Sequence, residues 1–145
     1  MFKHILIPTD GSDLSRKAML YGMKLAKLAN AKVTALTVRA PYSVSSIDVI
    51  GVVGSSDEYD EETRQAAERA LTQVSMAGEA EGLKVETLQE VNDQPYRAII
   101  ECALANKCDL IVMASHGRRG VSALLLGSET TKVLTHSKIP VLVYR

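Results

Sequence analysis

The sequence predicts an α/β domain in which helices cover both faces of a five-stranded parallel sheet, a doubly wound fold. Three observations support this prediction. Five short β-branched and apolar segments alternate with four helical segments, and right-handed crossovers turn such an alternation into a parallel sheet. The run from Leu110 to Ala114 is apolar without alternation, as in a strand covered on both faces. At 145 residues, the chain is expected to form a single domain, 1–145.

The first strand is predicted from Lys3 to Thr9, with Pro8 near its end, where a missing amide proton is tolerated. Asp10 follows this strand, and the residues alone favour a turn in which its side chain accepts a local backbone hydrogen bond. Ser12 is suited to cap the next helix, which is expected to continue to about Asn30.

The second strand is predicted from Lys32 to Val38 and is followed by a long connection, Ala40 to Ser56. This connection is rich in glycine and serine but also contains β-branched apolar residues, so it is either a loop with a small core of its own or a lid over a ligand. The next helix is predicted from Asp57 to Gly82. Its first turns are acidic, which fits the positive end of a solvated helix better than an acidic catalytic site.

The third strand, Val85 to Val91, is predicted at a sheet edge because Glu86 and Glu90 require water. The polar residues of the segment 92–95 are expected to cap a helix that continues to about Lys107. Four positions of this helix are expected to face inward: Ala98, Ile99, Cys102 and Ala103.

A glycine-bearing basic loop follows the fourth strand. Gly117 and Gly120 allow it to turn, and Arg118 and Arg119 give it positive charge. Gly127-Ser128 supplies a second bend, with Ser128 expected as the N-cap of the last helix. Backbone amides in such a loop and at such a helix start can bind an anion.

The last helix is predicted from Ser128 to Ser137 and the last strand from Val141 to Tyr144. This strand is short and apolar and has no following segment to cover it. Because an uncovered strand edge tends to pair with another chain, the sequence predicts a homodimer through the C-terminal strand.

Composition excludes several classes of function. Hydrophobic residues make up 46% of the chain and charged ones 23%, with zero net charge, which argues against general binding of nucleic acid or acidic membranes. No segment reaches membrane-spanning length and the start lacks a leader pattern, so a cytoplasmic location is expected. Cys102 and Cys108 have neither redox nor zinc spacing, and no metal site is predicted.

A specific resemblance extends over the whole chain. Ser115-His116-Gly117, nine residues and then Gly127-Ser128 resemble the ATP-binding signature of the universal stress protein family. The opening Ile-Pro-Thr-Asp-Gly-Ser (residues 7 to 12) and the ending Ile-Pro-Val-Leu-Val (139 to 143) are similar to the family as well. One position departs from the signature, since Ala114 replaces its first glycine.

The resemblance implies a Rossmann-like fold, like that of the adenine nucleotide alpha hydrolases, with strand order 3-2-1-4-5. This order places a switch point between the first and fourth strands, so that Asp10 and the Gly117 loop would face each other across one crevice. The function implied is that of a dimeric, ATP-binding regulator of stress responses, read by an unidentified protein partner. AMP or ADP could replace ATP, and Mg²⁺ could accompany it.

The resemblance also assigns roles to residues. The phosphates would lie at Gly117, Gly127 and Ser128, with the positive charge of Arg118 nearby and with Glu129 and Thr130 just inside the helix. The base side would be lined by Pro8, Thr9, Asp10 and Val38, and the ribose by Met113 and Ala114. Glu129 would repel a triphosphate unless its side chain points away or meets Mg²⁺.

Two alternatives remain at this stage. A slow ATPase would need a base, and Asp10 and His116 are the candidates, but the sequence assigns no carboxylate partner to His116, so no catalytic residue is predicted. An interaction module without nucleotide is the other alternative, because Ala114 alters the signature. We expect Ala114 to be tolerated, since it closes a regular strand, whereas Gly117 lies in the turn and is expected to need a positive φ.

Overall fold

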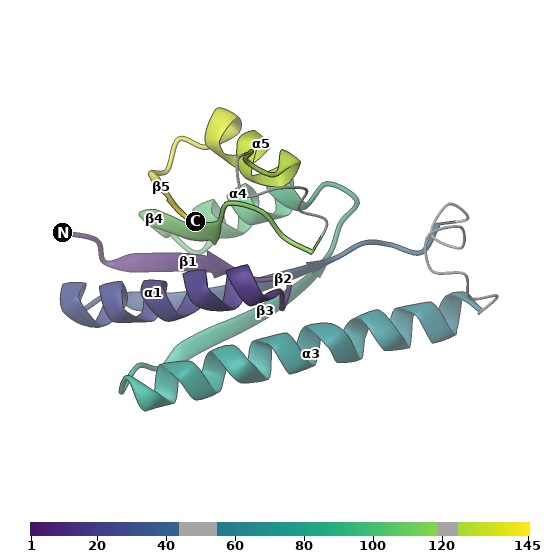
Figure 1. Ribbon diagram of the computed structural model, residues 1–145, viewed down its shortest axis with the longest axis horizontal. Helices are drawn as coiled ribbons and strands as arrows, with labels where there is room; N and C mark the ends of the chain where they lie inside the picture. The colour runs from purple at the N-terminus through teal and green to yellow at the C-terminus, as the bar shows by residue number, and fades with distance from the viewer. Residues whose placement is uncertain (44–54, 119–124) are drawn as a thin grey trace.

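The computed structural model describes residues 1–43, 55–118 and 125–145. Within them, a parallel sheet has the order β3-β2-β1-β4-β5 (Figure 1), as the resemblance implied. The strands and helices are, in chain order, β1 (His4–Pro8), α1 (Asp13–Ala29), β2 (Lys32–Arg39), α3 (Ser56–Ala80), β3 (Val85–Val91), α4 (Pro95–Ala105), β4 (Leu110–Ala114), α5 (Ser128–His136) and β5 (Val141–Tyr144).

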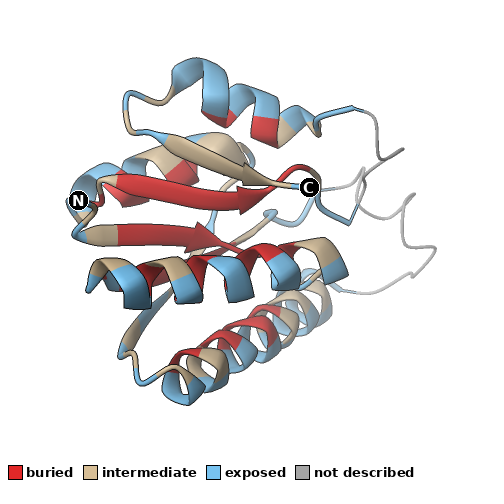
Figure 2. Cartoon of the chain, turned by 60° about the vertical axis from the view of Figure 1, so that its left-hand side comes forward, coloured by how far each residue is buried: buried red, intermediate tan, exposed pale blue. Residues whose placement is uncertain are grey.

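Two layers of helices enclose the sheet. Ile5 and Ile7 of β1 point to one face, where they pack with α1 and α3, and Leu6 points to the other, where it packs with α4 and α5. Every residue of β4 is buried, which confirms the prediction drawn from its unbroken apolar run (Figure 2). The carboxyl ends of β1 and β4 are therefore fixed from both faces.

Local capping agrees closely with the sequence. Ser12 caps α1, and its side-chain oxygen accepts a hydrogen bond from Ser15 N at 3.3 Å. At the other end, Asn30 has the left-handed conformation with φ 50°. The helix α3 begins at Ser56 rather than Asp57, because Ser55 and Glu58 form a reciprocal capping box.

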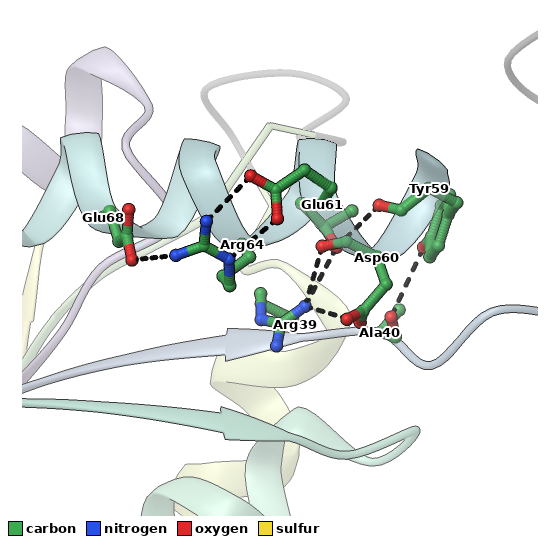
Figure 3. A network of polar contacts seen from close by, with 8 residues as sticks. Arg39, Ala40, Tyr59, Asp60, Glu61, Arg64 and Glu68 are labelled. Carbon is green, nitrogen blue, oxygen red and sulfur yellow. Dashed lines mark hydrogen bonds and ion pairs between the residues drawn. The ribbon is translucent and has the colours of Figure 1, made fainter. Parts of the chain in front are cut away.

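Polar side chains fix the start of α3 to the end of β2 (Figure 3). Arg39 Nη1 donates to the backbone oxygen of Asp60 at 3.2 Å, to Asp60 Oδ1 at 2.9 Å and to Thr63 Oγ1 at 3.1 Å. Further along the helix, a hydrogen bond from Arg64 lowers the pKa of Glu61 to about 2. The acidic residues of the first turns are exposed, which agrees with a solvated helix face.

Most of the long connection predicted before this helix, residues 44–54, lies outside the described residues.

The start of α4 differs from the prediction. No side chain of its own N-terminal segment caps it: Gln94 occupies the N-cap without a side-chain hydrogen bond, and Asn92 Oδ1 accepts from Gln94 N at 2.8 Å in the preceding turn. The helix ends at Ala105, two residues before Lys107, but its four predicted inward positions are all buried. β3 lies at a sheet edge, as predicted from Glu86 and Glu90.

Candidate functional site

The loops that follow β1 and β4 meet at the carboxyl edge of the sheet. The chain leaves β1 toward β2 on one side and leaves β4 toward β5 on the other, so the two loops lie at the switch point of the sheet, where ligands of open parallel sheets bind. The loops are joined across it: Arg118 N donates to Asp10 Oδ2 at 2.8 Å, over a sequence separation of 108 residues. The predicted juxtaposition of Asp10 with the Gly117 loop is therefore present.

Asp10 bridges the two loops through both oxygens of its carboxylate. Oδ1 accepts from Ser12 N at 3.0 Å while Oδ2 accepts from Arg118 N. Burial raises the pKa of Asp10, but hydrogen bonds from Ser12, from the Arg118 amide and from Ser15 together outweigh it and hold the pKa below its ordinary value. The carboxylate is consequently charged at neutral pH.

The reason for a glycine at position 117 differs from the one expected. Gly117 is absent from the described glycines with positive φ, which are Gly11 at 77° and Gly82 at 73°, so the predicted positive φ was wrong. A Cβ at Gly117 would instead overlap the Asp10 carboxylate. Glycine is needed here because the loop and the carboxylate approach each other so closely.

The start of α5 also corrects the prediction. Gly127 is the N-cap, in an extended conformation with φ −63° and ψ 156°, and Ser128 is the first helical residue rather than the cap. Gly127 N donates to Ser115 O at 2.7 Å. A Cβ on Gly127 would lie 3.2 Å from His116 Cα, tighter than nine in ten real contacts of this kind. This glycine therefore lets α5 begin directly against the loop that follows β4.

Helix α5 begins without a side-chain cap. The N-termini of the other described helices have side-chain partners: Ser12 for α1, Ser55 with Glu58 for α3, and Glu129 for α4. At α5 the N-cap is a glycine, and no side chain of the described residues forms a capping bond. The amides of Ser128 to Thr130 have no acceptor within the helix, so this N-terminus is open to an anion.

Glu129 and Thr130 have structural contacts. Glu129 Oε2 accepts a hydrogen bond from Tyr96 N at 2.9 Å, and its Oε1 lies 3.2 Å from Lys132 Nζ. Thr130 is buried, and its Oγ1 donates to Ala114 O at 3.0 Å. The two side chains thus attach the first turn of α5 to α4 and to β4, and the Glu129 carboxylate points toward α4.

We expect Glu129→Ala to lower the free energy of unfolding by about 1 kcal/mol, because the first turn of α4 would lose the carboxylate that caps it. Urea denaturation of the purified variant measures this change. The matched control is Glu101→Ala, which removes an exposed carboxylate further along α4 and should change stability by less than about 0.5 kcal/mol. Equal losses in the two variants would contradict the capping role.

The predicted base and ribose side lies at the ends of β1, β2 and β4. Pro8 ends β1, and the Thr9 carbonyl after it accepts from Thr37 Oγ1 at 3.0 Å. Val38 is half-buried near the end of β2. Met113 and Ala114 close β4 with 6% and 8% exposure, so only a small part of each is accessible. Ala114 lies in a regular strand and is not among the described residues with positive φ, as we expected from its position.

His116, a candidate base in the loop after β4, has no carboxylate partner among the described residues. His116 Nδ1 lies 3.2 Å from Ser115 Oγ, and no carboxylate contacts the ring in the described part of the chain.

Burial raises the pKa of Cys102 to about 11 and that of Cys108 to about 12, so both thiols are protonated at neutral pH. Among the described residues, no three metal-binding side chains gather in one place, and no helix is long and apolar enough to cross a membrane.

Arg118 is exposed at the end of the described loop, while Arg119 and Gly120 lie outside the described residues. Sequence reasoning missed two contacts of this region, the Glu129 cap of α4 and the Asp10 bond to Arg118 N. The first joins residues 33 apart and the second residues 108 apart. Neither contact leaves a periodic or spaced pattern in the sequence by which it could have been found.

Comparisons of the sequence with known proteins all lead to the same protein family. The model of the universal stress protein family matches residues 1–145. A universal stress protein of Methanocaldococcus jannaschii is 34% identical over 145 residues, which cover 100% of this chain and 83% of the relative. Universal stress protein YxiE of Bacillus subtilis is 30% identical and is matched over 100% of both chains.

Solved structures give the same result. A Methanocaldococcus jannaschii protein whose structure was a test case for assigning biochemical function has a TM-score of 0.82 at 28% identity, covering 99% of this chain and 96% of that one. A universal stress protein in complex with cAMP has a TM-score of 0.75 at 26% identity, covering 99% and 97%. The fold is also that of universal stress protein UspA from Lactobacillus plantarum, with a TM-score of 0.82 at 24% identity.

Proposed function

Since the chain belongs to the universal stress protein family, we propose that it binds an adenine nucleotide in the crevice between the loops after β1 and β4. ATP is the expected ligand, with AMP and ADP as the alternatives. In this proposal the nucleotide-bound protein acts in a stress response, where a further protein reads its state. The complex of a related protein with cAMP supports an adenine nucleotide as the ligand class.

The open N-terminus of α5 is the observation that carries this proposal. No side chain of the described part of the chain caps its first amides, whereas the other described helices each have a side-chain cap. The partial positive charge of a helix N-terminus favours an anion, and phosphate is the anion that adenine nucleotides supply. Arg118 contributes a guanidinium at the same edge of the sheet.

The residues fit a nucleotide laid along the edge of the sheet. Its phosphates would lie at the Gly117 loop and at Ser128, where side chains are absent or small. Its base would lie toward Val38 at the end of β2, and its ribose beside Met113 and Ala114. With Glu129 held by α4, Mg²⁺ would enter bound to the phosphates of ATP, whose charge it would partly neutralise.

We expect adenine nucleotides to raise the melting temperature. A ligand at about 100 times its dissociation constant stabilises the folded state by roughly 2.7 kcal/mol. A thermal-shift titration with ATP, ADP, AMP and adenosine measures the effect, and Ser128→Ala should reduce it for the phosphorylated ligands while leaving adenosine nearly unchanged. If millimolar concentrations of all four ligands leave the melting temperature unchanged, the protein acts through its surfaces and the nucleotide proposal fails.

A homodimer through β5 is part of the proposal. The strand lies at one edge of the sheet, where its outward backbone groups lack a strand partner in the described chain. Its last residue, Tyr144, packs on Tyr21 of α1 with ring centroids 5.7 Å apart, which holds the end of the strand in place. A rigid edge of this kind is suited to pair with the same edge of a second copy.

A further inference from the structure

The two loops of the crevice interlock through a reciprocal contact. Asp10 of the first loop lies against Gly117 of the second, where a Cβ would overlap its carboxylate. Arg118 of the second loop lies against Gly11 of the first, where a Cβ would be 3.2 Å from Arg118 Nη2. Each loop therefore has a glycine where the charged residue of the other loop approaches.

A series of hydrogen bonds, the first to the Asp10 side chain and the others between backbone groups, links Asp10, the loop after β4 and the start of α5. The Asp10 carboxylate holds Arg118 N at 2.8 Å, which fixes the far end of the described loop. The near end of the loop holds the helix, because Ser115 O accepts from Gly127 N at 2.7 Å. Ser115 is itself anchored to β5, since its N donates to Tyr144 O at 2.8 Å. His116, between this anchor and Gly117, lies directly against Gly127, so displacement of the loop would reach the N-cap of α5.

We propose that Asp10 is a positioning residue, which holds residues 115–118 so that this loop and the start of α5 present their amides to phosphate. The inference rests on the proposed function and makes it more specific. It differs from the base-side role that the family resemblance implied for Asp10, because both carboxylate oxygens are engaged by backbone amides of the loops.

The charge of Asp10 allows its positioning role to be distinguished from its electrostatic effect on phosphate. A carboxylate near bound phosphates repels them, so loss of its charge alone would raise phosphate affinity. Loss of its positioning bond would instead lower that affinity. Asp10→Asn separates these effects, because the amide has one acceptor oxygen in place of two and can no longer hold Ser12 N and Arg118 N from opposite sides.

Isothermal titration of the full-length protein with adenosine, AMP and ATP tests the inference. In Asp10→Asn we expect the affinities for AMP and ATP to fall at least about tenfold, with adenosine within about twofold. Asp13→Asn is the matched control, since Asp13 lies three residues further on with a 95% exposed side chain, and it should bind all three ligands as the wild type does. Arg118→Ala keeps the amide proton and should lose less ATP affinity than Asp10→Asn.

The other outcomes overturn the inference in distinguishable ways. An equal loss of adenosine, AMP and ATP affinity in Asp10→Asn would assign Asp10 to the base or ribose, and a gain in ATP affinity would make its effect purely electrostatic. Wild-type protein that binds none of the ligands would refute the proposed function instead.

Amide hydrogen exchange tests the positioning bond without any ligand. The Arg118 amide should exchange at least about tenfold faster in Asp10→Ala than in the wild type, because it loses its acceptor. The amides of β1 and β4 should keep their protection, which shows that the sheet is intact. Equal exchange rates of the Arg118 amide in the two proteins would overturn the inference, whether or not the protein binds nucleotides.

Discussion

Gly117→Val is expected to reduce ATP affinity by at least about tenfold, or 1.4 kcal/mol, while adenosine affinity changes little. The valine side chain would occupy the space of the Asp10 carboxylate and so push the loop away from Asp10 and from the start of α5. Adenosine lacks the phosphates that this loop would bind, so it is insensitive to the displacement. Isothermal titration with both ligands measures the difference.

The control is Ala114→Gly, which restores the first glycine of the family's signature. Because Ala114 already lies in a regular strand, we expect this change to alter ATP affinity by less than about tenfold. If ATP binds strongly to this variant and not to the wild type, the methyl group of Ala114 abolishes nucleotide binding in the wild-type protein. Equal losses of ATP and adenosine in Gly117→Val would contradict a phosphate-binding role for the loop.

Val141→Lys combined with Val143→Lys is expected to convert the proposed dimer to a monomer. Two lysines on the edge strand β5 place like charges opposite each other in a symmetric pairing of this strand with its copy, and lysine on an edge strand opposes such pairing. Light scattering coupled to size-exclusion chromatography measures the mass. A dimer of unchanged mass would place the interface elsewhere.

Because these valines are half-buried, a second variant tests the same edge without new charge. The carbonyls of Pro140 and Tyr144 accept from the amides of Ile111 and Ser115, so the backbone of Val143 faces outward by the alternation of a parallel ladder. Val143→Pro removes one outward amide and should weaken the dimer while the fold persists. Val91→Lys, at the opposite edge of the sheet, is the matched control and should leave the mass unchanged.

Much of the fold could be predicted because its determinants are local. The bounds of β3, β4 and β5 agree with the prediction to the residue, since apolar runs in β4 and β5 and a partly alternating pattern in β3, each bounded by turns, define them. The cap of α1 at Ser12 and the left-handed Gly82 after α3 depend on groups only a few residues away. The strand order was expected from family resemblance alone, because alternation of strands and helices is compatible with several orders.

The sequence by itself therefore determined the strands and most of the helices, and it placed Asp10 and Gly117 at strand ends that share one edge of a parallel sheet. Only the tertiary structure decided what these residues do there. Gly117 leaves room for the Asp10 carboxylate and has no positive φ of its own, and Glu129 accepts a hydrogen bond from the start of α4. The physical reason is that excluded volume and hydrogen bonding act between groups close in space, whatever their separation along the chain.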